Sequence, residues 1–218
     1  MSVKHNQGIV VDGLKLLFDG KDPASKSDKV TAGDLSGHGN TGTMNSGRGL
    51  HFISGSGPDP GGVGKNRAGE YILAGTKSHT LPVGSEPRTL AFWCNIDADI
   101  ITDIMPNYDK YLMGWGDGSR GGQYFGVRHT GMSYGSTLNL VVQNPGDASW
   151  TDIDTPVSAS SIAGSWHHLA FTYAGASTVK FYLDGAYNYE ASTVLALNTA
   201  TASVDSPITI GCRWNDNN

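Results

Sequence analysis

Short stretches in which apolar and polar residues alternate recur along the chain, whereas helical periodicity is hard to find. Neighbouring residues of a strand point to opposite faces, so alternation with period two indicates strands with one buried face. Glycine, proline, asparagine and aspartate separate the stretches, as turns require. The stretches are Gly13–Asp19, Gly49–Ser54, Glu70–Gly75, Thr89–Asp97, Lys110–Gly116, Gln123–His129, Thr137–Gln143, Trp166–Tyr173, Thr178–Gly185, Ala186–Ser192 and Pro207–Trp214. The pattern predicts an all-β sandwich, with residues 1–218 as a single domain.

Two adjacent histidines stand in the stretch SWHHLAFTYAGASTVKFYLDG and raise the question of a metal site. On a strand, His167 lies on the face of the apolar residues that follow it, and His168 lies on the opposite face. The two imidazoles therefore cannot converge on one ion, and we interpret them as packing and hydrogen-bonding residues. Asp184 and Gly185 both tolerate positive φ, which predicts a type I′ hairpin turn and a three-stranded meander.

The charge and the cysteine count exclude several classes of protein. A formal net charge of −5 over 218 residues does not suit binding to a nucleic-acid backbone, which needs clustered basic residues. No apolar run is long enough to span a bilayer, and no secretory signal peptide is visible. Two cysteines, Cys94 and Cys212, do not make a disulfide framework, so we interpret both as buried thiols.

Carboxylate pairs, which most glycosidases use, are hard to assemble from this sequence. The only glutamates, Glu70, Glu86 and Glu190, are isolated from one another. Asp152 and Asp154 would share a face of an extended segment, but solvated turn residues explain them better. We therefore predict a protein that is not an enzyme, with a glycoside hydrolase as a distant alternative.

Acidic residues in the predicted loops leave calcium as an alternative, although no EF-hand pattern is present. The candidate ligands are Asp34, Asp117 and Asp216, together with loop carbonyl groups.

Aromatic residues near strand ends are the candidates for contact with a carbohydrate or a protein partner. Flat aromatic rings can stack on sugars, but they are equally suited to a core or a protein interface. For any single one, we favour the core. The candidates are Trp115, Tyr124, Tyr134, Trp150 and Trp214.

The segments WHHLAFTYAGASTVKFYLDG and SPITIG closely resemble the laminin-G-like, pentraxin-related branch of the concanavalin A-like lectin/glucanase superfamily. Arg88–Asp97 resembles the strand that precedes this meander in the family, and DLSGHGNTGTM resembles its early turn. The resemblance implies a jelly-roll β-sandwich of two antiparallel sheets. The catalytic E-x-D-x-x-E strand of laminarinase-type members has no counterpart here, so the resemblance implies the binding branch, whose loops contact sugars, calcium or proteins.

The opening GIVVDGLKLLFDGKDPASKS…DLSGHGN also resembles laminin-G-like virion proteins of tailed bacteriophages. By analogy of fold, this implies a virion surface protein that decorates a capsid or forms part of a tail fibre. Its partners would be other virion proteins or copies of itself, with host-surface glycans as a further option. The alternative is an extracellular, carbohydrate-binding lectin module, with calcium as an option.

The family's pattern continues beyond the PITIG strand into a closing strand, whereas this sequence ends at Asn218. Either the sequence is truncated or the fold lacks that strand. We expect residues that follow Asn218, or a strand from a neighbouring subunit, to complete the sheet. The added strand would pair near Gly13–Asp19, whose edge would otherwise be unpaired.

Overall fold

The computed structural model describes the parts of the chain that form the sandwich. These are residues 12–18, 31–44, 72–74, 81–95, 110–116, 124–129, 137–143, 150–175, 178–192, 199 and 208–210. The elements are β1 (Thr31–Ala32), β2 (Gly42–Met44), β3 (Ile72–Ala74), β4 (Arg88–Asn95), β5 (Lys110–Gly116), β6 (Tyr124–His129), β7 (Thr137–Gln143), β8 (Trp150–Ser158), the 3₁₀ helix η3 (Ala159–Ile162), β9 (Trp166–Tyr173), β10 (Thr178–Leu183), β11 (Ala186–Ser192) and β12 (Ile208–Ile210).

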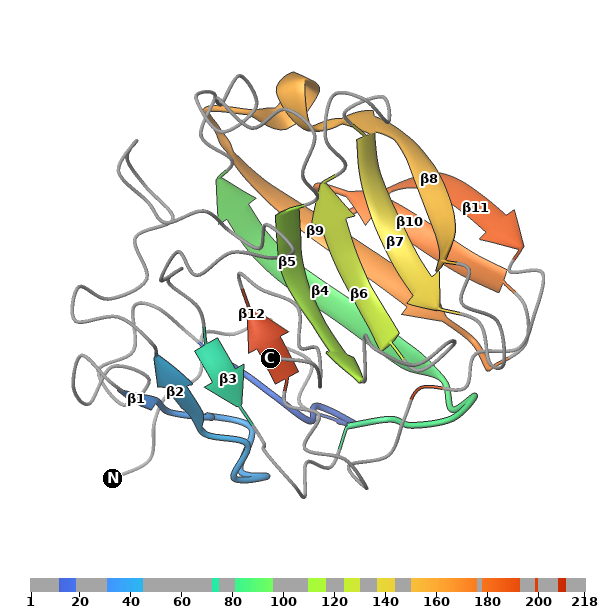
Figure 1. The fold of residues 1–218 in the computed structure, drawn as a ribbon. Coiled ribbons are helices and arrows are strands. Elements are labelled where there is room, and N and C mark those ends of the chain that lie inside the picture. Colours follow the sequence, from blue (N-terminus) through green and yellow to red (C-terminus); the bar gives the residue numbers. More distant parts are fainter. Residues whose placement is uncertain are drawn as a thin grey trace.

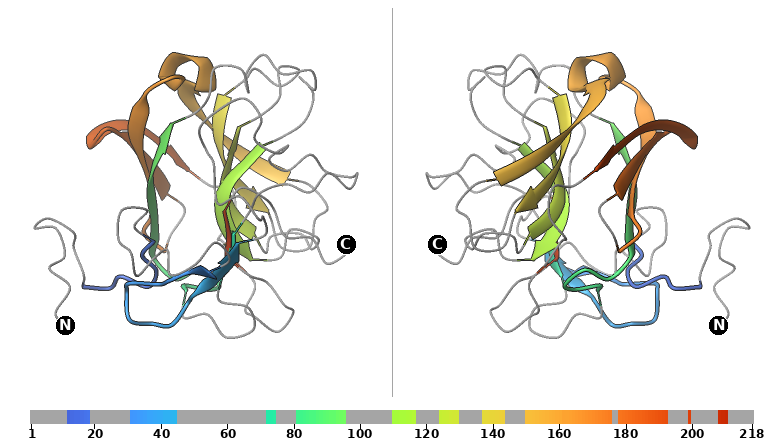
Figure 2. Two further views of the ribbon diagram at one scale, coloured as in Figure 1. Left: turned by 90° about the vertical axis from the view of Figure 1, so that its left-hand side faces the viewer. Right: turned by 90° about the vertical axis from the view of Figure 1, so that its right-hand side faces the viewer.

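The strands form two antiparallel sheets that pack face to face (Figures 1 and 2). One sheet has eight strands in the order β1-β2-β3-β12-β5-β6-β7-β8, and the other has four in the order β11-β10-β9-β4. The chain crosses from the first sheet to the second between β8 and β9, where η3 caps one end of the sandwich. This architecture confirms the predicted all-β sandwich of two antiparallel sheets.

The core lies between the sheets and is built from the inward face of each strand. In β9, Leu169, Phe171 and Tyr173 are buried, and in β8 every second residue from Ile153 to Val157 is buried. Phe171 stacks on Phe181 of β10 with ring centroids 4.8 Å apart. Period-two alternation therefore places apolar side chains on one face, as the sequence pattern predicts.

The β9–β10–β11 meander agrees with its prediction in register and in turn geometry. Antiparallel pairing runs from Val179↔Tyr173 to Leu183↔Leu169 between β10 and β9. Asp184 has φ 52° and Gly185 has φ 78°. Both residues of the turn therefore adopt the left-handed conformation that a type I′ hairpin requires, which confirms the turn.

The segment Gly13–Asp19 differs from its prediction. Its described part, residues 12–18, belongs to no strand. The Leu17 N–H instead donates to the Asp34 carboxylate at 3.0 Å, and its carbonyl accepts from the Leu35 N–H at 2.9 Å. The expected strand with an unpaired edge is therefore wrong here, because a side chain and a turn supply the backbone partners.

One strand was not predicted, and some predicted segments lie outside what the structure describes. The long strand β8 was not expected, because Asp152, Asp154 and Pro156 obscure its alternation. The stretch Gly49–Ser54 and the residues after Ile210 lie outside the described residues. The described part of the chain contains no helix of the length and apolar character needed to cross a membrane.

Arg88, the first residue of β4, is a buried cation that ties this strand to the loop before it. Only 5% of the residue is exposed. Its guanidinium donates to the carbonyls of Glu86, Val83 and Gly84 and to the Thr199 hydroxyl, at 2.6 to 3.2 Å. Burial lowers its pKa to about 10, so the group stays protonated at neutral pH. The cation therefore fixes one end of the four-stranded sheet.

Candidate functional site

Trp115, one of the predicted contact aromatics, lies in the core. It is 3% exposed, and its ring centroid is 5.0 Å from that of Phe125. The indole N–H donates to the Pro82 carbonyl at 2.9 Å. The core interpretation therefore holds for Trp115, whose ring is not accessible to a ligand in solvent.

Tyr124 is also buried, with 1% exposed. Its ring lies across Gly114 and Gly126, and a Cβ added at either glycine would overlap it. The two glycines thus make room for the tyrosine on the face of β5 and β6 opposite Trp115. The other predicted aromatics fall outside what the structure describes: Tyr134, Trp214 and the side chain of Trp150.

Asp34, a predicted calcium ligand, holds the turn of the DLSGHGN motif together. Its carboxylate accepts hydrogen bonds from the backbone N–H groups of Leu17, Ser36 and Asn40 and from the Ser36 hydroxyl, at 2.9 to 3.0 Å. Burial raises the pKa of Asp34, but the hydrogen bonds outweigh it and the net shift is downward. The four acceptor positions of a carboxylate are thus committed within the protein.

Two other polar residues of this motif, Ser36 and Asn40, form hydrogen bonds with the backbone of Lys15. The Ser36 hydroxyl shares its one hydrogen between the Asp34 carboxylate and the Lys15 carbonyl, 3.0 Å away, and the Asn40 amide donates to the same carbonyl at 2.8 Å. Within the described residues, no group of three or more His, Cys, Asp or Glu side chains could hold a metal ion. The other predicted ligands, Asp117 and Asp216, lie outside the described residues.

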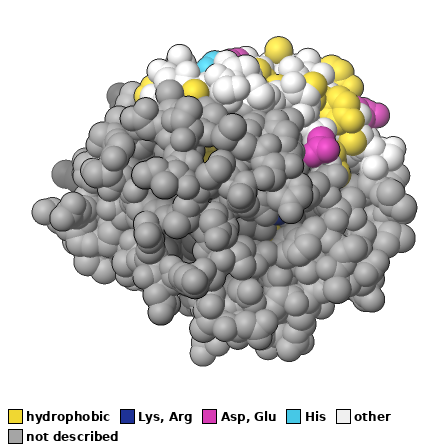
Figure 3. Space-filling view, turned by 45° about the horizontal axis from the view of Figure 1, so that its top comes forward, with side chains coloured by type: hydrophobic (Ala, Val, Ile, Leu, Met, Phe, Trp, Pro, Cys, Tyr) yellow, Lys and Arg dark blue, Asp and Glu magenta, His cyan; other side chains and the backbone are white. Residues whose placement is uncertain are grey.

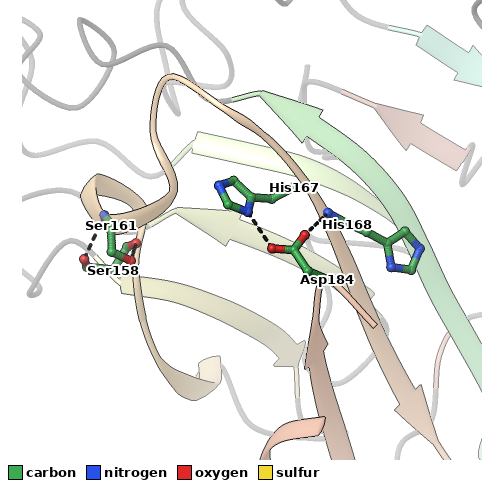
Figure 4. A network of polar contacts seen from close by, with 5 residues as sticks. All are labelled: Ser158, Ser161, His167, His168 and Asp184. Carbon is green, nitrogen blue, oxygen red and sulfur yellow. Dashed lines mark hydrogen bonds and ion pairs between the residues drawn. The ribbon is translucent and has the colours of Figure 1, made fainter. Parts of the chain in front are cut away.

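The histidines His167 and His168 point away from each other, with Asp184 between them (Figure 4). The His167 Nδ1 lies 2.8 Å from one oxygen of Asp184, and the His168 backbone N–H donates to the other at 2.9 Å. The His168 carbonyl in turn accepts from the Asp184 N–H at 2.8 Å. Hydrogen bonds from His168 and His167 lower the pKa of Asp184. The histidines therefore fasten the β10–β11 turn to β9.

Cys94 faces the same side of the four-stranded sheet as His167, its register partner on β9. Burial, followed by the Asp184 charge, raises the pKa of the Cys94 thiol to about 11. The thiol is therefore protonated at neutral pH and weakly nucleophilic, in agreement with a structural role. Cys212 lies outside the described residues.

Four large aromatic side chains of the four-stranded sheet are exposed, and none of them was among the predicted contact residues. The large hydrophobic side chains exposed in the described part of the chain are Trp93 (64%), Trp166 (53%), Tyr187 (59%) and Tyr189 (37%). All four are tryptophan or tyrosine, and each ring therefore has its own N–H or O–H group.

Strand register brings most of these rings together. Trp93 of β4 is paired with His168 of β9, and their ring centroids are 5.3 Å apart. Tyr182 of β10 is paired with Tyr187 of β11, with ring centroids 5.9 Å apart. Trp166 lies two residues before His168 and so points to the same side. We call the surface formed by these five side chains the aromatic face.

Small residues separate the two ring pairs. Ala91 of β4 pairs with Ala170 of β9, which in turn pairs with Tyr182 of β10. The two alanines thus lie in the same cross-strand row as the tyrosines, next to the row of Trp93 and His168. With strands spaced about 4.8 Å apart, the aromatic face extends about 14 Å from β4 to β11. It is therefore longer than a single sugar ring.

Tyr189 does not belong to the aromatic face. It is paired with Phe181, whose side chain is in the core, and a register shift separates this pair from Tyr182↔Tyr187. Because residues paired directly across strands share a face, Tyr189 points to the inner side at the sheet edge. It is an exposed tyrosine that lies on the same strand as Tyr187 but faces away from the site.

The charged groups beside the aromatic face are few. Lys180 of β10 forms an ion pair with Glu190 of β11 at 3.4 Å, and Asp184 occupies the turn next to His168. Figure 3 shows hydrophobic side chains next to acidic ones on the described part of the surface in that view. The aromatic face therefore combines flat rings, hydrogen-bonding groups and a small negative charge.

Comparison with solved structures finds similar folds at low sequence identity. The ligand binding domain of botulinum neurotoxin serotype D, in complex with N-acetylneuraminic acid, matches with a TM-score of 0.63 and 14% identity, over 94% of this chain and 44% of that chain. The receptor binding domain of the botulinum neurotoxin C/D mosaic serotype matches with 0.60 and 12%, over 94% and 45%. The binding domain of Paraclostridial Mosquitocidal Protein 1 matches with 0.55 and 15%, over 87% and 45%.

The chain thus spans less than half the length of each of these structures, and at such identities the likeness shows the fold alone. No curated protein sequence matches the chain.

A family comparison covers more than half of the sequence. Residues 66–218 match the Laminin_G_3 family, described as the concanavalin A-like lectin/glucanases superfamily. The matched range includes every element from β3 onward, and with them the β9–β10–β11 meander on which the resemblance depended. The chain therefore belongs to the concanavalin A-like lectin/glucanases superfamily.

Proposed function

We propose that this protein is a non-enzymatic, glycan-binding module and that the aromatic face is its binding surface. The observation that carries the proposal is the chemistry of the exposed rings. In the described residues, the large hydrophobic side chains that remain exposed are all tryptophan or tyrosine, whereas aliphatic side chains lie in the core. Three of the four exposed rings lie on the aromatic face.

Such a surface suits a sugar better than a second protein core. A pyranose ring has an apolar C–H face that packs on an aromatic ring, and its hydroxyl groups need nearby donors and acceptors. The indole N–H groups, the tyrosine hydroxyls and the His168 ring provide these groups at the edges of the rings.

The similar structures support the proposal without deciding it. The serotype D domain is a ligand binding domain in complex with a sugar, N-acetylneuraminic acid, and the others are also named as binding domains. The sequence has no E-x-D-x-x-E strand. In the described part of β8, Asp154 is an exposed carboxylate on a sheet surface. Both observations favour binding over hydrolysis.

A glycan array with the purified protein tests the proposal. We expect wild-type protein to retain one or more oligosaccharides, and Trp93→Ala to lose most of that signal. Removal of one stacked ring should weaken binding by about 1–3 kcal/mol, as in other sites that stack rings on planar ligands. The matched control is Tyr189→Ala, which removes an exposed ring that faces away from the site and should bind as wild type does. Equal binding by all three proteins, or by none, would refute the proposal.

We further propose that the module is displayed on a phage particle, where it would bind host-surface glycans or neighbouring virion proteins. The support is the opening of the chain, which resembles laminin-G-like virion proteins. Within this opening, Asp34 and Leu35 form hydrogen bonds with Leu17. Mass spectrometry of purified particles tests the proposal: a fixed copy number per particle supports it, and absence from particles contradicts it.

A further inference from the structure

The charges around the aromatic face narrow the class of glycan. Resting on the proposed function, we propose that the aromatic face selects neutral glycans and disfavours those that carry carboxylates. The serotype D domain, by contrast, is known with an acidic sugar.

Among the described residues, Asp184 is a charged group next to His168, whose ring packs against Trp93. Its carboxylate is bonded to the His168 backbone N–H and to the His167 ring, so it is fixed beside the site. The hydrogen bonds from His168 and His167 also keep the pKa of this carboxyl below its ordinary value, so it is ionised at neutral pH. An incoming carboxylate would thus meet a fixed negative charge.

The cation on the outer side of this sheet is already compensated. The Lys180 ammonium lies 3.4 Å from the Glu190 carboxylate, which offsets its charge. Arg88, on β4, is buried and donates to four oxygen atoms inside the protein. Among the described residues of the four-stranded sheet, no unpaired cation faces the rings. The net charge of −5 for the whole chain adds to this bias.

The size of the effect follows from the distance between the charges. In water, a ligand carboxylate about 6 Å from another carboxylate is bound about threefold more weakly than a neutral group, and the hydrogen bonds from His167 and His168 to Asp184 make this the upper value here. Salt screens this repulsion, because the Debye length falls from about 30 Å at 0.01 M to about 3 Å at 1 M. Stacking of the rings on the neutral part of the ligand is not screened.

The experiment compares neutral ligands with acidic relatives. Affinity electrophoresis would use three pairs of probes with the wild-type protein: mannan against polymannuronate, dextran against carboxymethyl dextran, and N-acetyllactosamine against its sialylated form on a polymer carrier. We expect the neutral member of each retained pair to bind more tightly at low salt, by up to about threefold. The difference should disappear near 1 M salt, while neutral binding changes little.

A single substitution provides an internal check. Glu190→Gln leaves Lys180 without its partner, so binding of the acidic member should rise about threefold while the neutral member is unchanged. Acidic probes that bind as tightly as neutral ones in wild type, or a preference that neither salt nor Glu190→Gln alters, would overturn the inference and leave glycan binding intact. Retention of no probe at all would overturn both proposals.

Discussion

Replacing Arg88 by methionine tests how the four-stranded sheet is held in place. The change keeps most of the side-chain volume and removes the charge and all N–H donors. Four hydrogen bonds are lost, to the Glu86, Val83 and Gly84 carbonyls and to the Thr199 hydroxyl, although the Val83 and Gly84 carbonyls still accept from the N–H groups of Glu86 and Thr199. At about 1 kcal/mol for each hydrogen bond lost, the loss is about 4 kcal/mol.

The surroundings recover part of this loss. The guanidinium lies 5.4 to 5.9 Å from the ring centroids of Trp115, Phe125 and Tyr173, and a thioether packs well in such a place. A recovery of about 1 kcal/mol leaves a net destabilisation of about 3 kcal/mol. For a domain of this size, the melting temperature should fall by about 6–12 °C.

Urea unfolding at pH 7, followed by tryptophan fluorescence, measures the change in the free energy of unfolding. The control is Lys180→Met, which removes a half-exposed cation from the same sheet and should change that energy by no more than about 0.5 kcal/mol. If Arg88→Met is destabilised by less than about 1 kcal/mol, or by no more than Lys180→Met, the buried cation does not anchor β4 and the reasoning is wrong.

Three further predictions concern single side chains. Asp34→Ala should lower the free energy of unfolding by about 2 kcal/mol at pH 7. Because the pKa of Asp34 is lowered in the folded protein, the stability that its carboxylate contributes is lost as the pH falls through the folded pKa. The melting curves of variant and wild type should therefore converge at acid pH and not at neutral pH. With Cys212 replaced by serine, Cys94 should react slowly with a disulfide reagent at pH 8 in the folded protein and fast once unfolded, since its thiol pKa is about 11; equal rates would contradict this. Zinc or nickel should not raise the melting temperature, because His167 and His168 point apart; a rise abolished by substituting either histidine would show a metal site.

Much of the fold could be predicted from the sequence, because one-sided burial leaves a period of two. The strands β5, β7, β9 and β11 begin and end at the residues that the pattern indicated. Apolar alternation predicts a strand wrongly where groups other than a neighbouring strand form the hydrogen bonds of the backbone. Leu17 lies in an apolar stretch that resembles a strand, yet its backbone is bonded to Asp34 and Leu35. In β8, aspartate and proline residues obscure the alternation, so a real strand was missed.

The candidate site was harder to predict, because a position near a strand end does not decide whether an aromatic ring is exposed. Trp115 lies near the end of an alternating stretch and is in the core, whereas Trp93 lies in the middle of one and is exposed. The signal was present in TLAFWCN: Leu90 and Phe92 define the inner face, so Trp93 stands on the outer one. Which outward rings meet depends on pairing between strands distant in sequence, which one sequence does not reveal.

NMR of the indole N–H groups shows where on the protein a glycan binds. A neutral oligosaccharide retained on the array would be titrated into ¹⁵N-labelled protein, with each indole assigned by substitution. If the aromatic face is the binding surface, the signals of Trp93 and Trp166 shift with a common dissociation constant while the buried Trp115 indole, bonded to the Pro82 carbonyl, stays unchanged. Saturable binding with no shift at Trp93 or Trp166 would mean that the glycan binds elsewhere and that the aromatic face is not its site.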